Sequence, residues 1–196
     1  IGFAIGDVAG KSVPAAFYMA VARTLLRSAT DAHASPAACM ATVDRLLSDY
    51  DIPGIFVTAF LGILDTRTNL ITYANAGHCL PYIGNNDGNL RELEGGRSTV
   101  LGIGAGLTYE EDEVPLQPGE FLFLYTDGVT ESISAAGHDF GNGSLEAWLR
   151  ANCTVSAEQI GEGVLNAITD FAHGREQHDD LTCLVVRQHM IHSDHP

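Results

Sequence analysis

The hydrophobic pattern of this chain predicts helices in two pairs, and a series of strands lies between the pairs. Apolar residues recur at steps of three and four in two segments near the start and in two near the end. The four predicted helices cover residues 14–30, 36–50, 144–151 and 156–172. Paired helices between runs of strands favour an α+β layered sandwich over a series of βαβ units.

The other apolar runs are typical of strands. They cover residues 1–5, 56–65, 69–75, 80–83, 90–93, 107–114, 120–125 and 181–187. Turn sequences predict three antiparallel hairpins between successive strands. Thr66-Arg67-Thr68 closes the first, an Asn- and Gly-rich loop closes the second, and Gln117-Pro118-Gly119 closes the third, which pairs residues 107–114 with residues 120–125. The glycine-rich residues 101–106 are predicted to form a loop.

No linker or internal repeat interrupts these patterns. We therefore expect residues 1–188 to form one domain and residues 189–196 to form a polar tail. The chain has 196 residues, and its 45% hydrophobic content is enough to fill one core. Residue 1 already lies in a strand pattern, so the chain is expected to begin inside its domain.

Three aspartates stand at the ends of predicted strands. Asp7 follows the first strand, Asp127 follows residues 120–125, and Asp179 comes just before the last strand. Strand ends are held rigidly by their sheet, so carboxylates there can gather around a cation at little ordering cost. With the backbone carbonyl of Val8 they form an oxygen-only ligand set, which favours Mg²⁺ or Mn²⁺ over Zn²⁺. Two such ions about 4 Å apart bind phosphate oxygens and activate water, so no protein nucleophile is needed.

Each motif alone has a simpler interpretation. Asp127-Gly128 is a common turn sequence, and Asp179-Asp180 is typical of a solvated pair. The Gly-Asp and Gly-Lys pairs within residues 6–11 lack the spacing of a phosphate-binding P-loop. The acidic residues 109–113 are more typical of a solvated edge than of a site. The conjunction of three aspartate motifs in one small acidic chain is what favours the metal site.

The acidic composition narrows the range of partners. The formal net charge is −15, from 25 acidic and 10 basic residues, which argues against nucleic acid and anionic membrane as partners. No uninterrupted apolar run approaches the roughly 20 residues that span a bilayer. The four cysteines form no Cys-x-x-Cys pair and are typical of reduced thiols, so we expect a cytoplasmic location.

The same segments contain five longer motifs. They are Gly-Asp-Val-Ala-Gly-Lys-Ser-Val-Pro-Ala-Ala at residues 6–16, Asn-Ala-Gly-His at 75–78, Leu-Gly-Ile at 101–103, Tyr-Thr-Asp-Gly-Val-Thr-Glu at 125–131 and Asp-Asp-Leu-Thr at 179–182. In this order, and over nearly the whole chain, they resemble the signature of bacterial metal-dependent (PPM-type) serine/threonine phosphatases of the SpoIIE/RsbU branch.

The resemblance implies two packed antiparallel β-sheets flanked by helix pairs, with a two-metal site at one end. By motif position, Asp7 would bridge two Mn²⁺ or Mg²⁺ ions and the Val8 carbonyl would bind one of them. Asp127 and Asp179 would complete the shell of the second ion, with Asp180 as the second choice to Asp179. The nucleophile would be a metal-bound water, so no side chain is assigned a catalytic role.

Two further residues have open roles. His78 is a candidate general acid, although a histidine after Ala-Gly at a strand end is more often a turn residue hydrogen-bonded to the backbone. Lys11 could neutralise phosphate or lie in solvent. The chain departs from the family pattern at Ser12, where glycine is usual, and at Cys79-Leu80, where prolines are common. The family's opening strands and their acidic residue are missing, so an exposed sheet edge and an incomplete site are expected.

The resemblance predicts a hydrolase, a serine/threonine protein phosphatase that acts on phosphoserine or phosphothreonine of a regulatory protein. The expected substrate is a STAS-domain anti-anti-sigma factor, and residues 13–50 are expected to form a homodimer or to couple to an upstream sensor. One alternative is a non-catalytic phosphatase-like binding module. A structural Ca²⁺ site is a weaker alternative, because no EF-hand spacing is present.

Overall fold

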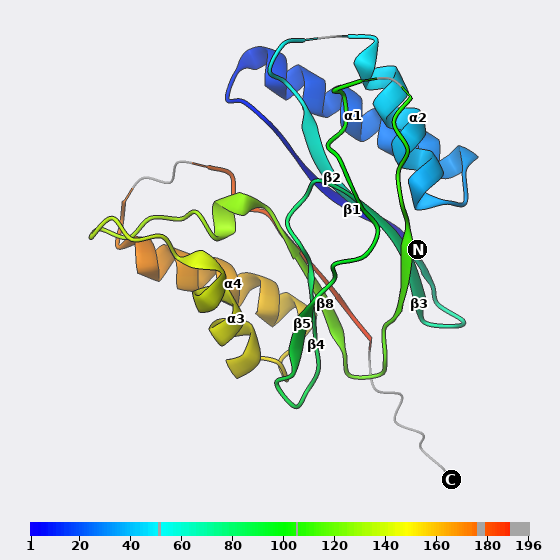
Figure 1. Ribbon diagram of the computed structural model, residues 1–196. Coiled ribbons are helices and arrows are strands. Elements are labelled where there is room, and N and C mark those ends of the chain that lie inside the picture. Colours follow the sequence, from blue (N-terminus) through cyan, green and yellow to red (C-terminus); the bar gives the residue numbers. More distant parts are fainter. Residues whose placement is uncertain (51, 105, 176–178, 189–196) are drawn as a thin grey trace. The chain divides into compact units, whose positions relative to one another are not determined.

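The computed structural model describes residues 1–50, 52–104, 106–175 and 179–188. They form two compact units, each with one β-sheet and one pair of α-helices (Figure 1). Unit 1 comprises Ile1–His78 and Glu94–Pro115, and unit 2 comprises Cys79–Leu93 and Leu116–Pro196. The predicted α+β class is confirmed. That residues 1–188 form one domain stays a prediction, and the predicted tail 189–196 lies outside the described residues.

The sheet of unit 1 has the strand order β1-β2-β3-β6, and β7 also pairs with β3. Its strands are β1 (Gly2–Val8), β2 (Val57–Asp65), β3 (Leu70–Ala76), β6 (Arg97–Ser98) and β7 (Asp112–Pro115). The predicted β2–β3 hairpin is confirmed, and β1 pairs with β2 so that Val8 faces Val57. β1 extends to Val8, so Asp7 and Val8 are its last two residues and not residues beyond its end.

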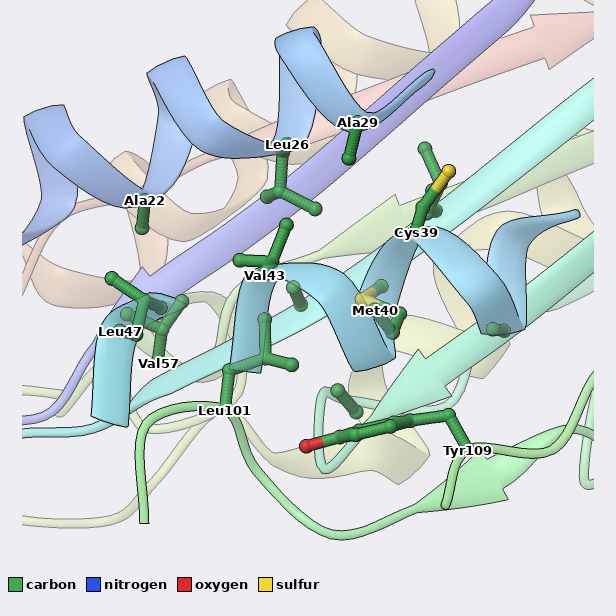
Figure 2. Packing of buried hydrophobic residues seen from close by; sticks show 14 of the residues in the cluster. Ala22, Leu26, Ala29, Cys39, Met40, Val43, Leu47, Val57, Leu101 and Tyr109 are labelled. Atoms are coloured by element: carbon green, nitrogen blue, oxygen red, sulfur yellow. The ribbon is translucent and has the colours of Figure 1, made fainter. Parts of the chain in front are cut away.

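Two helices, α1 (Val13–Ala32) and α2 (Pro36–Ser48), pack on this sheet. In each, a serine before the first turn accepts a hydrogen bond from a backbone N–H of that turn, and a proline stands in the turn itself. Their apolar faces form the core of unit 1 together with residues of the sheet and its loops. This core includes Ala22, Leu26, Ala29, Cys39, Met40, Val43, Leu47, Val57, Leu101 and Tyr109 (Figure 2).

The acidic segment 109–113 overlaps the start of β7, but one of its residues has a structural role beyond that of a solvated edge. Glu111 Oε2 accepts hydrogen bonds from the Ser35 hydroxyl at 2.6 Å and from the Ala37 N–H at 3.1 Å. Its carboxylate therefore extends the N-terminal cap of α2, where free N–H groups and the helix dipole favour an anion. Glu111 and Ser35 are 76 residues apart, so local sequence does not reveal this contact.

Unit 2 contains a four-stranded antiparallel sheet in the order β5-β4-β8-β9. Its elements are β4 (Tyr82–Gly84), β5 (Leu90–Glu92), β8 (Phe121–Tyr125), α3 (Gly141–Ala151), α4 (Ala157–Ala172) and β9 (Cys183–Arg187). The predicted β4–β5 hairpin and the Ser156–Gln159 capping box are confirmed. The ring of Tyr125 stacks on Tyr82 and Phe123 at centroid separations of 6.0 and 5.9 Å, within the core that α3 and α4 cover.

The predicted hairpin between residues 107–114 and residues 120–125 is wrong. β7 is a short strand that pairs with β3 in unit 1, whereas β8 pairs with β4 and β9 in unit 2. All five residues of β8 are buried, and its two neighbours occupy both of its edges, so no edge is left for β7. The turn at Gln117-Pro118-Gly119, with Gly119 at φ 88°, leads the chain from one sheet to the other.

Two smaller differences concern short or polar segments. The two-residue strand β6, which pairs in parallel with β3, was not predicted, and α3 begins at Gly141, before the expected position at residue 144. Among the described residues, no helix combines the length and apolar character needed to cross a bilayer.

Candidate metal centre

Thr126 fixes the end of β8 in unit 2. Its N–H donates to the Thr182 carbonyl at 3.0 Å, and its hydroxyl accepts from the Thr182 N–H at 3.1 Å. The same hydroxyl donates to the Asp180 carbonyl at 3.1 Å. We call these three hydrogen bonds the Thr126 clamp. Because the clamp joins the end of β8 to the segment before β9, it brings Asp127 and Asp179 to one place within unit 2.

Gly128 allows these two segments to approach closely. A Cβ atom at this position would lie 2.5 Å from the Asp180 carbonyl oxygen and 3.4 Å from Asp179 Cβ. The first distance is far inside van der Waals contact, so a larger residue would push the segments apart. The glycine of the Asp-Gly motif is therefore required by packing, beyond any role in a turn.

The side chains of Asp127 and Asp179 are half-buried, and that of Asp180 is exposed. Asp127 opens a short 3-10 turn, Asp127–Val129, and its carbonyl accepts from the N–H groups of Thr130 and Glu131, which follow the turn. The Asp180 N–H donates to Asp179 Oδ1 at 2.9 Å, which orients the Asp179 carboxylate. The position of Asp179 beside Gly128 and its lower exposure favour Asp179 over Asp180 as the ligand.

In unit 1, Asp7 lies opposite Thr58 of β2. The Thr58 hydroxyl donates to the Asp7 carbonyl oxygen at 3.4 Å and lies 3.0 Å from His78 Nδ1. A hydroxyl has one hydrogen, so both contacts are hydrogen bonds only when His78 Nδ1 carries a proton and donates to Thr58. His78 is thereby linked to the strand end that carries Asp7 and Val8.

The Asn-Ala-Gly-His motif forms a closed turn that positions His78. Asn75 Oδ1 accepts from the His78 N–H at 2.7 Å, and Asn75 Nδ2 donates to the His78 carbonyl at 3.1 Å. Gly77 has φ 69°, and a Cβ there would lie 2.6 Å from Val100 Cγ1, so only glycine fits. The expected turn at His78 is present, and the buried imidazole also contacts Thr58. Lys11 is exposed in the turn after β1.

The predicted ligands are divided between the units. Asp7 and Val8 belong to unit 1, and Asp127 and Asp179 belong to unit 2. Within the described ranges, no group of three or more His, Cys, Asp or Glu side chains is placed to hold a metal ion. The full ligand set therefore stays a prediction, of which the structure brings together the pair in unit 2.

Thr126 and Thr58, which contact these strand ends, were missed from the sequence, as was Asp44, a buried residue of α2 whose Oδ1 accepts from the Gly102 N–H at 2.9 Å. Thr126 directly precedes Asp127, and this adjacency was the available signal. Thr58 faces Asp7 only through the pairing of β1 with β2, so its signal was the strand register. Asp44 interrupts the otherwise apolar buried face of α2, and that interruption was its signal.

Comparison with known proteins places the chain in the family that its motifs resemble. A family model described as stage II sporulation protein E (SpoIIE) matches residues 1–189. Protein IcfG of Synechocystis sp. is 29% identical over 213 residues, which covers 95% of this chain and 33% of IcfG. Phosphoserine phosphatase RsbU of Bacillus subtilis is 27% identical over 192 residues, which covers 96% of this chain and 56% of RsbU. The chain thus spans only part of the length of these curated relatives.

Solved structures agree on the fold. The SiaA-PP2C domain of Pseudomonas aeruginosa has a TM-score of 0.83 and 26% identity, with 95% of this chain and 75% of that chain covered. The RsbU and RsbW domains of Rv1364c from Mycobacterium tuberculosis give a TM-score of 0.82 at 24% identity, with 96% and 53% covered. The fold is therefore PP2C-like, as the motif resemblance implied.

Proposed function

Because the chain belongs to the SpoIIE family of PPM-type phosphatase domains, we propose that it is a metal-dependent serine/threonine protein phosphatase. The observation that supports the proposal is the Thr126 clamp, which joins the segment of Asp127 to the segment of Asp179, two aspartates that are half-buried. Two carboxylates gathered in this way suit a hard dication better than a packing role.

The residues fit Mn²⁺ or Mg²⁺. The proposed ligands are the carboxylates of Asp7, Asp127 and Asp179 and the carbonyl of Val8, a set made of oxygen atoms alone. When bound, the two ions would supply Lewis-acid binding of phosphate oxygens and a lowered pKa of water. Asp180, exposed beside Asp179, remains the substitute ligand.

The protein's own groups have positioning tasks in this account. The Thr126 clamp and the close contact at Gly128 hold Asp127 and Asp179 in place within unit 2. Thr58 and His78 hold the strand end of Asp7 within unit 1. Lys11, exposed just after this strand, is a candidate to neutralise part of the phosphate charge.

The substrate that we propose is phosphoserine or phosphothreonine on a regulatory protein, namely a STAS-domain anti-anti-sigma factor. Support comes from the relative RsbU, which is named a phosphoserine phosphatase, and from Rv1364c, in which an RsbU domain and an RsbW domain occur together. We further propose that residues 13–50 contact a second copy or an upstream sensor. Val13 and Phe17 of α1 are 72% and 70% exposed, which leaves apolar surface for such a contact.

The direct test is phosphate release from p-nitrophenyl phosphate and from a phosphoserine peptide, with Mn²⁺ and with EDTA. Asp127→Asn is expected to lower Mn²⁺-dependent turnover on the order of 100-fold. The matched control is Asp87→Asn, an aspartate in the β4–β5 loop of the same unit, which should behave as wild type. Equal turnover by Asp127→Asn and wild type would contradict the metal mechanism. Mn²⁺ binding without turnover would favour the non-catalytic binding module.

A further inference from the structure

Helix α2 buries a carboxylate in the core of unit 1. Asp44 is 0% exposed, and its Oδ1 accepts a hydrogen bond from the Gly102 N–H at 2.9 Å. Within the described part of the chain, no hydrogen bond to Asp44 Oδ2 has normal geometry, because the nearby Tyr109 hydroxyl donates to the Val100 carbonyl at 3.1 Å. Burial raises the pKa of Asp44, and the proximity of this hydroxyl lowers it in part. The ionisable side chains that interact with Asp44 are Tyr18 of α1 and Tyr109. A buried carboxyl that has no cation beside it lowers the stability of the fold. We therefore expect Asp44 to have a role other than packing.

The partner of Asp44 belongs to a segment that completes the sheet. β3 pairs with β2 only as far as Ala59, so the backbone of Val57 has no β3 residue beside it. Leu101 takes that place: its N–H donates to the Val57 carbonyl at 2.8 Å and its carbonyl accepts from the Val57 N–H at 3.0 Å. On the other side, Val57 faces Val8 of β1. Leu101 therefore supports the end of the strand that carries Asp7 and Val8.

Gly102 fits closely between this segment and the helices. It has φ 85°, and a Cβ would lie 2.2 Å from the Tyr18 hydroxyl and 3.5 Å from Leu47 Cβ. Figure 2 shows the side chains of Leu101 and Val57 beside Leu47 and Val43 of α2. The side chain of Leu101 thus packs against apolar side chains of α2, and the Asp44 carboxyl accepts a hydrogen bond from the N–H of the next residue, Gly102.

We propose that Asp44 is a positioning residue for the metal-ligating strand end of unit 1. It holds the Leu101–Gly102 segment against Val57, and this pairing fixes the end of β1 at Asp7 and Val8. The link to metal rests on the proposed function, whereas the link to the strand end rests on the hydrogen bonds alone. The competing interpretation is that Asp44 contributes only to the general stability of the core.

Three variants separate the two interpretations. Asp44→Ala removes the acceptor of the Gly102 N–H. Asp44→Asn keeps an oxygen acceptor at nearly the same place and removes the charge. Cys39→Ala is the matched control, because Cys39 is equally buried on the same helix, but its thiol is hydrogen-bonded to the His33 carbonyl and not to the segment. If Asp44→Ala does not fold, Asp44→Ser, whose side chain is too short to reach Gly102, takes its place.

The first readout is backbone hydrogen exchange at Val57, Leu101 and Gly102. Asp44→Ala is expected to speed exchange at these amides at least about tenfold more than at the amides of β3, whereas Cys39→Ala should act evenly on both. The second readout is Mn²⁺ binding measured by calorimetry. Asp44→Ala is expected to weaken it about tenfold relative to Cys39→Ala, and Asp44→Asn should restore both properties.

Exchange in Asp44→Ala that rises evenly at these amides and at those of β3, as in Cys39→Ala, would overturn the positioning role. Failure of Asp44→Asn to restore local exchange would also overturn it, because the acceptor would then not be the relevant group. The exchange result is independent of the metal. A wild type that binds no Mn²⁺ would refute the proposed function, yet a local exchange effect would still establish that Asp44 positions the strand end.

Discussion

The two units hold their aspartate-bearing strand ends by different chemistry. In unit 2, the end at Asp127 is held by the Thr126 clamp, in which one hydroxyl joins main-chain groups. In unit 1, the end at Asp7 is supported by Thr58, by an imidazole at His78 and, through Gly102, by the buried carboxyl of Asp44. The Thr126 clamp of unit 2 consists of hydroxyl and main-chain groups alone. The contacts in unit 1 include two ionisable side chains, those of His78 and Asp44.

This difference has a consequence for how the units respond to conditions. Hydrogen bonds between hydroxyl and main-chain groups do not change with pH in the physiological range, but the contact of a buried carboxyl such as Asp44 changes where that carboxyl titrates. We therefore expect steric and hydroxyl substitutions to have the largest effects in unit 2. We expect pH to act mainly on unit 1.

The largest expected effect is that of Gly128→Ala. The new Cβ would lie 2.5 Å from the Asp180 carbonyl oxygen, so the two segments must separate. We expect the free energy of unfolding to fall by about 3 kcal/mol, the upper part of the range for overpacking. Urea unfolding measures this change. Gly143→Ala in α3 is the control, because a Cβ there would meet no neighbouring side chain within 4 Å, and stability should not fall. A wild-type stability for Gly128→Ala would show that the close approach is not needed.

A smaller effect is expected for Thr126→Val, which keeps the shape of the side chain but removes the hydroxyl. The Thr182 N–H then loses its acceptor, and an unsatisfied donor costs about 2 kcal/mol. The control is Thr169→Val in α4, whose exposed hydroxyl bonds only within its own helix and whose loss should cost less than about 0.5 kcal/mol. Equal urea midpoints for the two variants would mean that the clamp contributes nothing to unit 2.

The smallest effect is a pH dependence in unit 1. Burial raises the pKa of the Asp44 carboxyl above its ordinary value of 3.8, against the lowering effects of the Gly102 N–H and the Tyr109 hydroxyl. Between 3.8 and the raised pKa, the folded protein binds more protons than the unfolded chain, so stability falls as pH rises through this window. Asp44→Asn removes this titration, and its stability relative to wild type should increase as pH rises.

Urea unfolding from about pH 4 to about pH 8 checks this relation. Asp87→Asn serves as the control, since an aspartate in a surface loop should give a difference that does not vary with pH. A stability difference for Asp44→Asn that is flat across the window would mean that Asp44 does not titrate with a raised pKa. The contrast between the units would then be lost.

The sequence predicted well wherever the signal was periodic or adjacent. The helix pairs followed from apolar spacing, and the β2–β3 hairpin followed from its turn. In unit 2, Thr126, Asp127 and Gly128 are neighbours in the chain, so the motif already contained the strand end.

Prediction failed where contacts join distant segments. The turn at Gln117-Pro118-Gly119 resembles that of a hairpin, and nothing local shows that its two arms belong to different sheets. A parallel strand of two residues at Arg97–Ser98 leaves no periodic trace. The contact of Asp44 with Gly102 spans 58 residues, so it became visible only in the fold.

The central claim of the proposed function is that Asp7 and Asp127 are both metal ligands. The most direct measurement is calorimetric titration of Mn²⁺ into wild type, Asp7→Asn, Asp127→Asn and the control Asp87→Asn. We predict two tightly bound ions per wild-type chain and per control chain, with binding weakened on the order of 100-fold or lost in both Asp7→Asn and Asp127→Asn. Mn²⁺ binding by Asp7→Asn and Asp127→Asn that equals wild-type binding would contradict the account.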